Sequence, residues 1–413
     1  MASAGKVVVI GGGPSGLMAA GQAAENGATV VLLEKMKTPA RKLRITGKGR
    51  CNLTNIAEQR DFLAHLGRSG RFLNQAFNRF FSEDLIGFFE SLGLEVVVER
   101  GGRVFPAYQD APAVAKLLVD WNQNRGVRIK TGSVVEQLMM SNGIINGVVC
   151  NGRRIEADKV IVATGGKSYP RTGSTGDGYQ LAASVGHSII GVRLALVPLL
   201  AGSGEFSELA GLTLRNVKAR LYLNNKRIKD AFGELSFTAS GLSGPIILTI
   251  SSLVVQALDD KDRVVINIDL KPAVDEQKLE ARLLRDLDQR GQEPMSSLLR
   301  GLLPKPLVGF CLQETAIDPG LQGNRLRADE RKKLRYWLKN LTIEISGYSS
   351  FDEAIITSGG VNTREIDPRT MESKLVKGLY LIGELLDIQA DTGGYNLQAA
   401  FSTGWLAGRS AAL

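Results

Sequence analysis

The sequence contains very little cysteine and histidine, the side chains that most often hold metal ions or form redox-active pairs. Cysteine occurs three times in 413 residues, at widely spaced positions and without a Cys-x-x-Cys pair, and histidine occurs twice. This pattern argues against a disulfide framework, a structural zinc site and a dithiol redox centre. We therefore predict no metal site. The residues concerned are Cys51, Cys150, Cys311, His65 and His187.

The sequence also lacks a long apolar run. The best candidate, Ile189 to Leu200, is broken by Arg193 and Pro198 and is shorter than the roughly 18 apolar residues that a membrane-spanning helix needs. The first strand is expected to begin at Lys6, which leaves no room for a signal peptide. We therefore expect a cytoplasmic protein without a membrane partner.

Apolar residues and positive charge, by contrast, are abundant. Hydrophobic residues make up 44% of the chain, enough for a large core and for two or three domains. The net charge of +9 and the pI of about 9.4 favour acidic ligands, from nucleotide phosphates to RNA, although this balance alone identifies no ligand.

Residues 6–34 carry the most informative pattern. They predict a buried strand, a glycine-rich turn, an Ala-rich helix and a second buried strand that ends at an acid, in the order Val7–Ile10, Gly11–Gly16, Leu17–Asn26, Thr29–Leu33 and Glu34. Gly11 permits the tight turn, Gly13 lets the backbone approach a pyrophosphate, and Gly16 lets the helix pack closely on the strand. Glu34 can accept hydrogen bonds from a ribose diol. The stretch predicts a Rossmann-type nucleotide site; the alternative is a tight turn without a ligand.

A basic segment, Lys35 to Asn55, follows this acid. It is dense in Lys and Arg, and Gly47 and Gly49 permit close approach of the backbone to a ligand. One interpretation is a solvated basic loop. Because the segment directly follows the ribose-binding acid, we expect its charges to face a bound dinucleotide.

Helix and strand patterns fill residues 62–189. We expect helices at Phe62–Leu92, Pro112–Arg125 and Gly178–Val185, a hairpin at Val96–Val98 and Gly102–Pro106, and strands at Val127–Lys130, Val134–Met139, Gly143–Val149, Arg154–Glu156 and Lys159–Ala163. The phenylalanines of the first helical region are expected in the core. The last strand opens into paired glycines, which suits a chain passing close beneath a ligand. The following loop, Ser168–Tyr179, is expected near the cofactor; the alternative is a plain surface loop.

Residues 190–345 lack a nucleotide signature and indicate an insertion. Residues 190–272 predict a β-rich domain, with strands at Val192–Leu199, Asn216–Leu223, Glu234–Phe237, Ile246–Ile250 and Val264–Leu270. Residues 273–345 predict a helical domain, with helices at Glu276–Asp288, Pro294–Leu303 and Ala328–Leu338. The nucleotide-binding domain would then consist of residues 1–189 and 346–413.

The C-terminal segment has the same kind of pattern as the N-terminal stretch. A buried strand, an acid, a glycine pair and a helix start follow one another at Leu379–Ile382, Gly383–Glu384, Gly393–Gly394 and Tyr395–Asn396. The free amides of a helix N-terminus suit the electron-rich carbonyl edge of a flavin. A ligand held by both ends of the chain is long, so FAD fits better than NAD.

Five motifs carry a more specific signal. They lie at Gly49–Asn55, Phe237–Pro245, Thr357–Asn362, Arg369–Asp387 and Thr392–Gly404. They resemble a bacterial family described as BaiN-like or aminoacetone-oxidase-like NAD(P)/FAD-dependent oxidoreductases, which includes proposed 23S rRNA dihydrouridine synthases. The resemblance covers essentially the whole chain. It implies an α/β fold, namely a Rossmann-type FAD-binding domain with an inserted β-barrel-like domain and a small helical domain. Many members have a histidine where this chain has Ala239, so a catalytic role of that histidine does not transfer.

The motifs and the resemblance together imply bound FAD. NAD(P)H is expected at most as a transient electron donor, because no second complete G-x-G-x-x-G unit is present. The residues expected to bind FAD are Gly11, Gly13, Pro14, Ser15, Gly16, Glu34, Lys35, Arg41, Lys42, Gly49, Arg50, Cys51, Asn52, Val135, Ala163, Thr164, Gly165, Gly166, Gly359, Gly360, Gly383, Glu384, Asp387, Gly393, Gly394, Tyr395, Asn396 and Leu397.

The chemistries implied by the family share hydride transfer at flavin N5. The first hypothesis is reduction of uridine to dihydrouridine in ribosomal RNA. The positive charge supports it, as do the cations and aromatics of Arg325–Asn340, which could equally form an amphipathic helix with inward-packed rings. The second hypothesis is an oxidase or dehydrogenase of a small amine or other small molecule, and the third is a non-catalytic flavin-binding module. No pattern indicates the oligomeric state.

Cys51 is the one cysteine inside a motif, and it is the candidate catalytic residue. Its neighbours Lys48 and Arg50 would favour a thiolate. A thiol of near-neutral pKa could protonate the uracil ring after hydride addition. The alternative is a small packing residue against the flavin.

Overall fold

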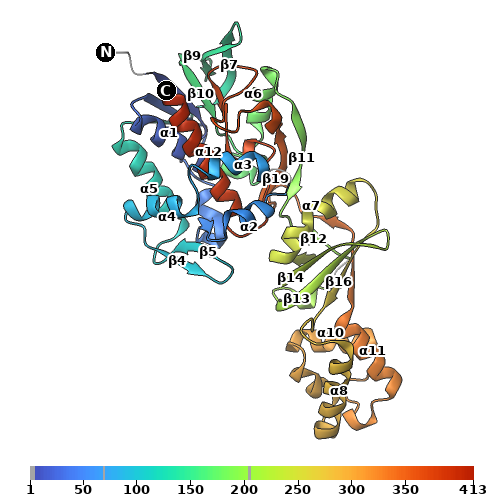
Figure 1. Ribbon diagram of the computed structural model, residues 1–413. Coiled ribbons are helices and arrows are strands. Elements are labelled where there is room, and N and C mark those ends of the chain that lie inside the picture. The colour runs from blue at the N-terminus through green and yellow to red at the C-terminus, as the bar shows by residue number, and fades with distance from the viewer. Residues whose placement is uncertain (1–4, 68–69, 203–205) are drawn as a thin grey trace. The chain divides into compact units, whose positions relative to one another are not determined.

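The computed structural model describes residues 5–67, 70–202 and 206–413, which form two compact units (Figure 1). The first unit consists of the described residues up to Ala195 together with Phe351–Leu413. The second unit, Leu196–Ser350, is inserted between these parts in the sequence. Its strands and helices share one apolar core, and its division into two domains stays a prediction.

A five-stranded parallel sheet forms the centre of the first unit. Its order is β20-β10-β1-β2-β6, with bounds Leu379–Leu381, Lys159–Val162, Lys6–Ile10, Thr29–Glu34 and Arg128–Thr131. Val7, Val8 and Val9 of the central strand are fully buried, which explains why it consists of β-branched residues. Because all strands run in one direction, their carboxyl ends meet at one edge.

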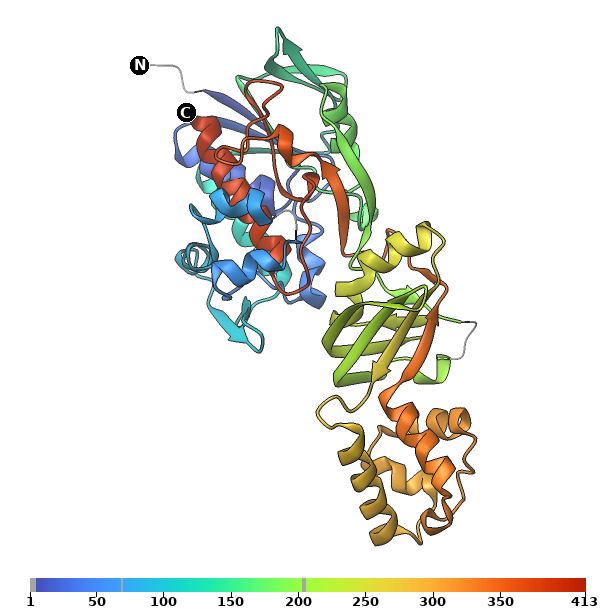
Figure 2. The same cartoon turned by 45° about the vertical axis from the view of Figure 1, so that its right-hand side comes forward.

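Helices α1 (Pro14–Glu25) and α12 (Tyr395–Ala412) pack on this sheet, and α5 (Ala111–Asn124) packs on α1. Although α1 and α12 come from opposite ends of the chain, they lie side by side (Figures 1 and 2). Their contact is close, since a Cβ at Gly404 would lie 2.4 Å from the carbonyl oxygen of Ser15. The two chain ends therefore build one layer of the first unit.

The helical region predicted at Phe62–Leu92 is divided into three short helices. A capping contact begins the last of them, because the Asp84 carboxylate accepts the backbone N–H of Phe81 at 2.8 Å. The helices are α2 (Gln59–Ala64), α3 (Gly70–Phe77) and α4 (Ser82–Ser91).

Phenylalanines of this region pack in the core, as predicted. The ring of Phe62 makes edge-to-face contacts with those of Phe77, Phe81 and Tyr395, at centroid distances of 5.2, 5.0 and 4.7 Å. This aromatic cluster fixes the start of α12 against α2 and α3.

Smaller elements complete the first unit. The predicted hairpin and meander are confirmed, and the hairpin gains a third strand. The sheets are β3-β5-β4 (Thr54–Asn55, Arg103–Pro106, Val96–Glu99), β7-β8-β9 (Val135–Ser141, Ile144–Cys150, Arg153–Glu156) and β11-β19 (Ile189–Ala195, Ile356–Val361). The helical segments are α6 (Asp177–Ser184), η1 (Leu43–Gly49), η3 (Pro170–Thr172), η7 (Thr363–Glu365) and η8 (Gly383–Leu385).

An antiparallel sheet forms the first part of the second unit, and α7 (Pro245–Asp259) packs on it (Figure 2). Its order is β17-β16-β13-β14-β15-β12-β18, with bounds Leu341–Ile345, Val264–Asp269, Thr213–Leu223, Lys226–Thr238, Gly241–Ser243, Leu199–Leu200 and Gly347–Tyr348.

The strand predicted at Ile246–Ile250 is wrong, because these residues lie in α7. Their β-branched side chains favour a strand, but the buried residues continue at helical spacing through Val254 and Val255. Pro245 stands at the first helical position, where its fixed φ favours a helix start.

The helical part of the second unit holds four helices among its described residues, which are α8 (Glu276–Arg290), α9 (Met295–Leu298), α10 (Lys305–Thr315) and α11 (Ala328–Lys339). The predictions for α8 and α11 are confirmed, whereas the helix predicted at Pro294–Leu303 is shorter and ends in a 3-10 turn. Helix α10 was not predicted because Pro306 and Gly309 resemble helix breakers. A proline at the second helical position, however, lacks only an N–H that would be unpaired anyway. Short 3-10 turns lie at Ser207–Leu209, Leu299–Gly301 and Gly323–Arg325.

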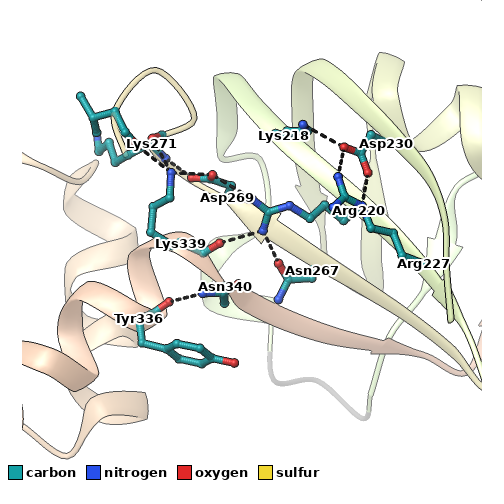
Figure 3. Close-up of polar contacts among 11 residues, drawn as sticks. Lys218, Arg220, Arg227, Asp230, Asn267, Asp269, Lys271, Tyr336, Lys339 and Asn340 are labelled. Carbon is teal, nitrogen blue, oxygen red and sulfur yellow. Dashed lines mark hydrogen bonds and ion pairs between the residues drawn. The ribbon is translucent and has the colours of Figure 1, made fainter. Parts of the chain in front are cut away.

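A buried ion cluster joins the sheet to these helices (Figure 3). The Asp269 carboxylate at the end of β16 lies 3.1 Å from the guanidinium of Arg220 on β13 and 2.7 Å from the ammonium of Lys339 at the end of α11. Lys339 also donates to the carbonyl oxygens of Lys271 and Val274, at 3.0 and 2.8 Å. The side chain of Asp269 is only 3% exposed, so its charge is balanced by direct contacts rather than by water.

Candidate functional site

Four segments expected to bind FAD meet at the carboxyl edge of the parallel sheet. They follow β1, β2, β10 and β20, whose carboxyl ends share this edge. Their residues are Gly11, Gly13, Pro14, Ser15 and Gly16; Glu34 and Lys35; Ala163, Thr164, Gly165 and Gly166; and Gly383 and Glu384.

The turn between β1 and α1 has the geometry of an anion site. A Cβ at Gly16 would lie 1.9 Å from the carbonyl oxygen of Gly11, so only glycine lets the helix start this close to the strand. A Cβ at Gly13 would meet nothing within 4 Å, and no side chain caps α1. The first-turn amides therefore face open space, which fits a pyrophosphate.

Glu34 is buried at the end of β2 beside this turn. Its carboxylate accepts the backbone N–H groups of Gly12 and Met36, at 2.8 and 2.7 Å. A carboxylate has further lone pairs, so it can also accept from a ribose diol. Val135 begins β7 nearby, since Ser133 donates its N–H to the Glu34 carbonyl oxygen at 3.0 Å.

Two lysines tie the basic segment to the other parts of the site. Lys35 forms an ion pair with Asp177, at the start of α6. Lys42 Nζ lies 2.7 Å from both Ser168 Oγ and Glu384 Oε2. These contacts join the basic segment to the loop at residues 168–177 and to the end of β20. Arg41, in contrast, points its side chain to the surface.

A second helix N-terminus lies in the first unit, at α12. Gly394 precedes it with a left-handed φ of 99°, and no side chain caps its first turn, Tyr395–Leu397. The Asn396 side chain instead holds the preceding loop, because its amide accepts the Ala390 N–H at 2.9 Å. With its amide oriented to accept, Asn52 receives the Gly394 N–H at 3.0 Å and brings the GRCN motif to this turn. Gly393 immediately precedes Gly394.

Gly359 and Gly360 lie in β19 against the segment that follows β20. A Cβ at Gly360 would lie 2.6 Å from the Leu385 carbonyl oxygen, and Asp387 donates its N–H to Val361 at 2.9 Å. Burial raises the pKa of Asp387, although a hydrogen bond from the Gly359 backbone opposes this. The absence of a side chain at Gly360 therefore lets β19 lie close against the segment that follows β20.

The near-neutral thiol expected at Cys51 is wrong. The side chain is fully buried, and this burial raises the pKa of Cys51 to about 12, although a hydrogen bond with Thr46 opposes the shift. The neighbouring cations do not help, because Lys48 is exposed and Arg50 pairs with Glu99. The sequence placed cations beside the thiol but could not show that the backbone turns their side chains away. Its full burial favours a packing role for Cys51. Gly49 nearby has a left-handed φ of 87°.

The basic run Arg325–Asn340 is largely committed to contacts within the second unit. Arg331 and Arg335 both bind Glu280, at 2.7 and 2.9 Å. Trp337 is buried, whereas Tyr336 is 65% exposed. The amphipathic-helix interpretation therefore explains most of this run.

Sequence reasoning missed a histidine–aspartate pair beside α12. His65 Nδ1 lies 2.9 Å from Asp391 Oδ2, and its ring stacks on that of Tyr395 at a centroid distance of 4.2 Å. The His65 side chain is 41% exposed. No local pattern could reveal this pair, because it joins residues from opposite ends of the chain.

The other histidine, His187, binds a residue of the Arg369–Asp387 motif and indicates a structural role for that part of it. Burial lowers the pKa of His187, so the neutral ring donates from Nδ1 to Glu365 at 2.9 Å and accepts at Nε2 from the Ser373 hydroxyl at 2.8 Å. Ser373 Oγ in turn accepts the N–H groups of Leu375 and Val376. The part of the motif around Ser373 therefore holds its own loop.

In the part of the chain that the structure describes, no helix is both long and apolar enough to cross a membrane. Across residues 5–67, 70–202 and 206–413, no three histidine, cysteine or acidic side chains gather as a metal site would require.

Comparisons with known proteins place the chain in a family. The model of the HI0933-like protein Rossmann domain matches residues 5–410. The chain is 35% identical over 410 residues to the 3-dehydro-bile acid delta(4,6)-reductase of Clostridium scindens, covering 98% of this chain and 99% of that one. It is 32% identical over 402 residues to the ribosomal RNA dihydrouridine synthase of Escherichia coli, covering 96% of each.

A solved structure, the 3-ketosteroid delta1-dehydrogenase of Sterolibacterium denitrificans, has the same fold, with a TM-score of 0.54, 13% identity and coverage of 98% of this chain and 99% of that one. The chain therefore belongs to the HI0933-like family, and the predicted Rossmann-type fold and FAD-dependent oxidoreductase class are both confirmed.

Proposed function

We propose that this oxidoreductase reduces a carbon–carbon double bond conjugated to a carbonyl, with NAD(P)H as electron donor and a uridine of ribosomal RNA as substrate. The observation that carries the proposal is that the N-termini of α1 and α12, two helices of the first unit that pack together, have no side-chain cap. One comes from each end of the chain, and α1 and α12 pack together, as a long two-part cofactor such as FAD requires.

Each part of FAD has a matching group in this chain. The Glu34 carboxylate would accept the ribose hydroxyls, the first-turn amides of α1 would bind the pyrophosphate, and those of α12 would face the flavin carbonyl edge. When bound, the flavin supplies hydride transfer between donor and substrate.

The substrate carbon that does not receive the hydride needs a proton. We assign this proton to His65, because imidazole is the side chain that most often serves as general acid. Its Nδ1 bonds to Asp391, which orients the ring and leaves Nε2 to hold the transferable proton. The pair stands beside the turn into α12, where the flavin ring would lie.

The names of the curated relatives support this substrate class. One is a reductase of a delta(4,6) bile acid and the other a dihydrouridine synthase, and both names describe the saturation of a double bond. Uridine offers such a bond next to its C4 carbonyl. A small-molecule enone is the second candidate, favoured by the higher identity to the bile acid reductase.

The decisive experiment identifies what reoxidises the reduced protein. The holoenzyme is reduced with NADPH or NADH without oxygen and mixed in turn with unmodified ribosomal RNA, a 3-oxo-4-ene steroid or buffer. We expect rapid reoxidation by the RNA and dihydrouridine in its digest. Reoxidation by the steroid alone would favour the small-molecule enone.

Two further outcomes would contradict the proposal. Peroxide formation with a primary amine and oxygen, without reoxidation by either alkene, would identify an amine oxidase. A flavin that no donor reduces would identify a non-catalytic binding module.

A further inference from the structure

We propose that a cationic surface of the first unit, formed by the basic segment and the β4–β5 hairpin, binds the phosphate backbone of the RNA substrate. We call it the loop–hairpin surface. The inference rests on the proposed function and adds the place where the RNA docks. We assign to it the accessible cations Lys37, Arg41, Lys48, Arg50 and Arg103, and the exposed apolar residues Ile45 and Tyr108; Arg50 joins the segment to the hairpin through Glu99 and Phe105.

Its charge comes from a long stretch without acids. Residues 35–57 contain seven Lys and Arg residues and no Asp or Glu. Lys37, Arg41 and Lys48 are exposed, and within the described residues none of them lies in an ion pair. Exposed cations without acidic partners can exchange their counterions for phosphates, which is the main source of affinity for nucleic acids.

The hairpin adds a second row of cations. The guanidinium carbons of Arg50 and Arg103 lie 4.3 and 5.7 Å from the centre of the Phe105 ring. Glu99 contacts both groups, with Arg50 at 2.5 Å and Arg103 at 3.7 Å. One carboxylate thus orients two guanidinium groups and neutralises only one charge, so the pair keeps a net positive charge for a ligand.

The surface is tied to the turn where we place the flavin ring. The Asn55 amide donates to the Gly101 carbonyl oxygen at the hairpin tip, at 2.9 Å, and to the Gly393 carbonyl oxygen, at 3.1 Å. One side chain therefore links the hairpin to the turn that precedes α12. An RNA strand held here would bring one of its bases to the reacting edge.

Exposed apolar side chains accompany the cations. Ile45 is 48% exposed, and Tyr108, just after β5, is 86% exposed. Recognition of single-stranded RNA combines a cationic track with aromatic rings on which unstacked bases lie. The rival surface on α11 also exposes a ring, that of Tyr336, but its Arg331 and Arg335 are bound to Glu280. The loop–hairpin surface is therefore the better site for an RNA loop.

The test compares two triple variants of the flavin-loaded protein. The first, Lys37→Ala/Lys48→Ala/Arg103→Ala, removes three cations of the surface, none of which is among the individual residues expected to bind FAD. The matched control, Arg325→Ala/Lys332→Ala/Lys333→Ala, removes three exposed cations of the run at Arg325–Asn340. Binding of a fluorescent single-stranded fragment of ribosomal RNA is measured over a range of salt concentrations, together with flavin content and the rate of flavin reduction by NADPH.

We expect the first variant to lose about tenfold or more in RNA affinity. The slope of log affinity against log salt concentration should fall by about 2, because each of the three lost phosphate contacts contributes roughly 0.7. Its flavin content and reduction rate should equal those of the wild type, and the control should bind RNA normally. Unchanged affinity of the first variant, an equal loss in the control, or no RNA binding by the wild type would each overturn the inference. Equal affinity for double-stranded DNA of the same length would do so too, since it would indicate a general polyanion site.

The same data separate this inference from the proposed function. If the wild type binds RNA through the loop–hairpin surface but forms no dihydrouridine, the proposed reaction fails and the surface stands. If it forms dihydrouridine while the first variant binds RNA normally, the surface fails and the reaction stands.

Discussion

At the scale of single residues, the candidate site depends on side chains that hold the backbone in place, whether or not a ligand is bound. Glu34 holds the N–H groups of Gly12 and Met36, and so shapes the turn on which we expect the pyrophosphate to lie. Cys51 has a φ of 61°, a conformation that few residues other than glycine adopt. At both positions, the features that shape the local backbone also belong to the expected cofactor site.

Glu34→Ala should weaken FAD binding by about tenfold or more. Each lost charge-assisted hydrogen bond is worth roughly 1.5–3 kcal/mol. The absorption spectrum of bound flavin should not change, because this acid is expected at the ribose. Equilibrium dialysis measures the affinity, and the Tm of the cofactor-free protein controls for the lost backbone contacts. Wild-type affinity would show that Glu34 has no role at the ribose.

Cys51→Ala should keep its FAD and nearly all of its turnover. Burial raises the pKa of this thiol to about 12, which makes it a poor proton donor at neutral pH. Turnover with ribosomal RNA is compared at equal flavin content. A loss of about 10²-fold or more would restore Cys51 as proton donor.

The same thiol makes the fold sensitive to alkali. Burial raises the pKa of Cys51 from 9.0 to about 12, so between these values the unfolded chain loses a proton that the folded chain keeps. The contribution of this thiol to the free energy of unfolding should therefore be constant below about pH 9 and fall as the pH rises from there toward 12. Urea unfolding at pH 8 and above should show a smaller fall for Cys51→Ala. Part of it should remain, since burial also raises the pKa of Cys150 and Cys311.

His65→Gln should slow the reoxidation of the reduced protein by RNA by about 10²-fold or more, while NADPH reduces the flavin at the wild-type rate. The imidazole is proposed to deliver a proton, which only the second half-reaction needs. Stopped-flow absorbance separates the two half-reactions. Asp391→Asn, which keeps the ring but weakens its orientation, should give a smaller loss. Equal reoxidation rates in His65→Gln would remove His65 from the mechanism.

At the scale of elements, the buried ion cluster fixes the helices of the second unit to its sheet. Asp269 is 3% exposed and has two cationic partners, so Asp269→Ala would leave Arg220 and Lys339 unpaired. We expect a loss of about 3–5 kcal/mol in the free energy of unfolding.

The exposed pair Arg263–Glu344, in the same sheet, is the matched control for this prediction. Glu344→Ala should cost at most about 1 kcal/mol, because water screens both partners. Urea unfolding of the two variants gives the comparison. Similar losses in both would mean that Asp269 contributes no more than a surface ion pair.

Helices and strands could be predicted from the sequence where a pattern of neighbouring residues determines them. The strand–turn–helix at residues 6–25 and the meander at residues 135–156 depend on neighbours in sequence, and both were found. The β-branched residues of α7 predict a strand despite their helical spacing, and the prolines and glycine in and around α10 are more typical of a loop than of a helix. The contacts of His65 with Asp391 and of Asn55 with Gly393 depend on the tertiary fold, so no window of sequence could show them.

At the scale of the whole molecule, the first unit is assembled from both ends of the chain around an inserted second unit. Strand β20 joins the sheet beside β10, and α12 packs on α1. During synthesis, the N-terminal fingerprint therefore emerges long before the segment that completes its sheet. The turn at Gly394 and the amides of α12 become available only when almost the entire chain has been made. We therefore expect cofactor loading at the proposed site to be a late event, and we expect an incomplete chain to expose the α1 face that α12 covers.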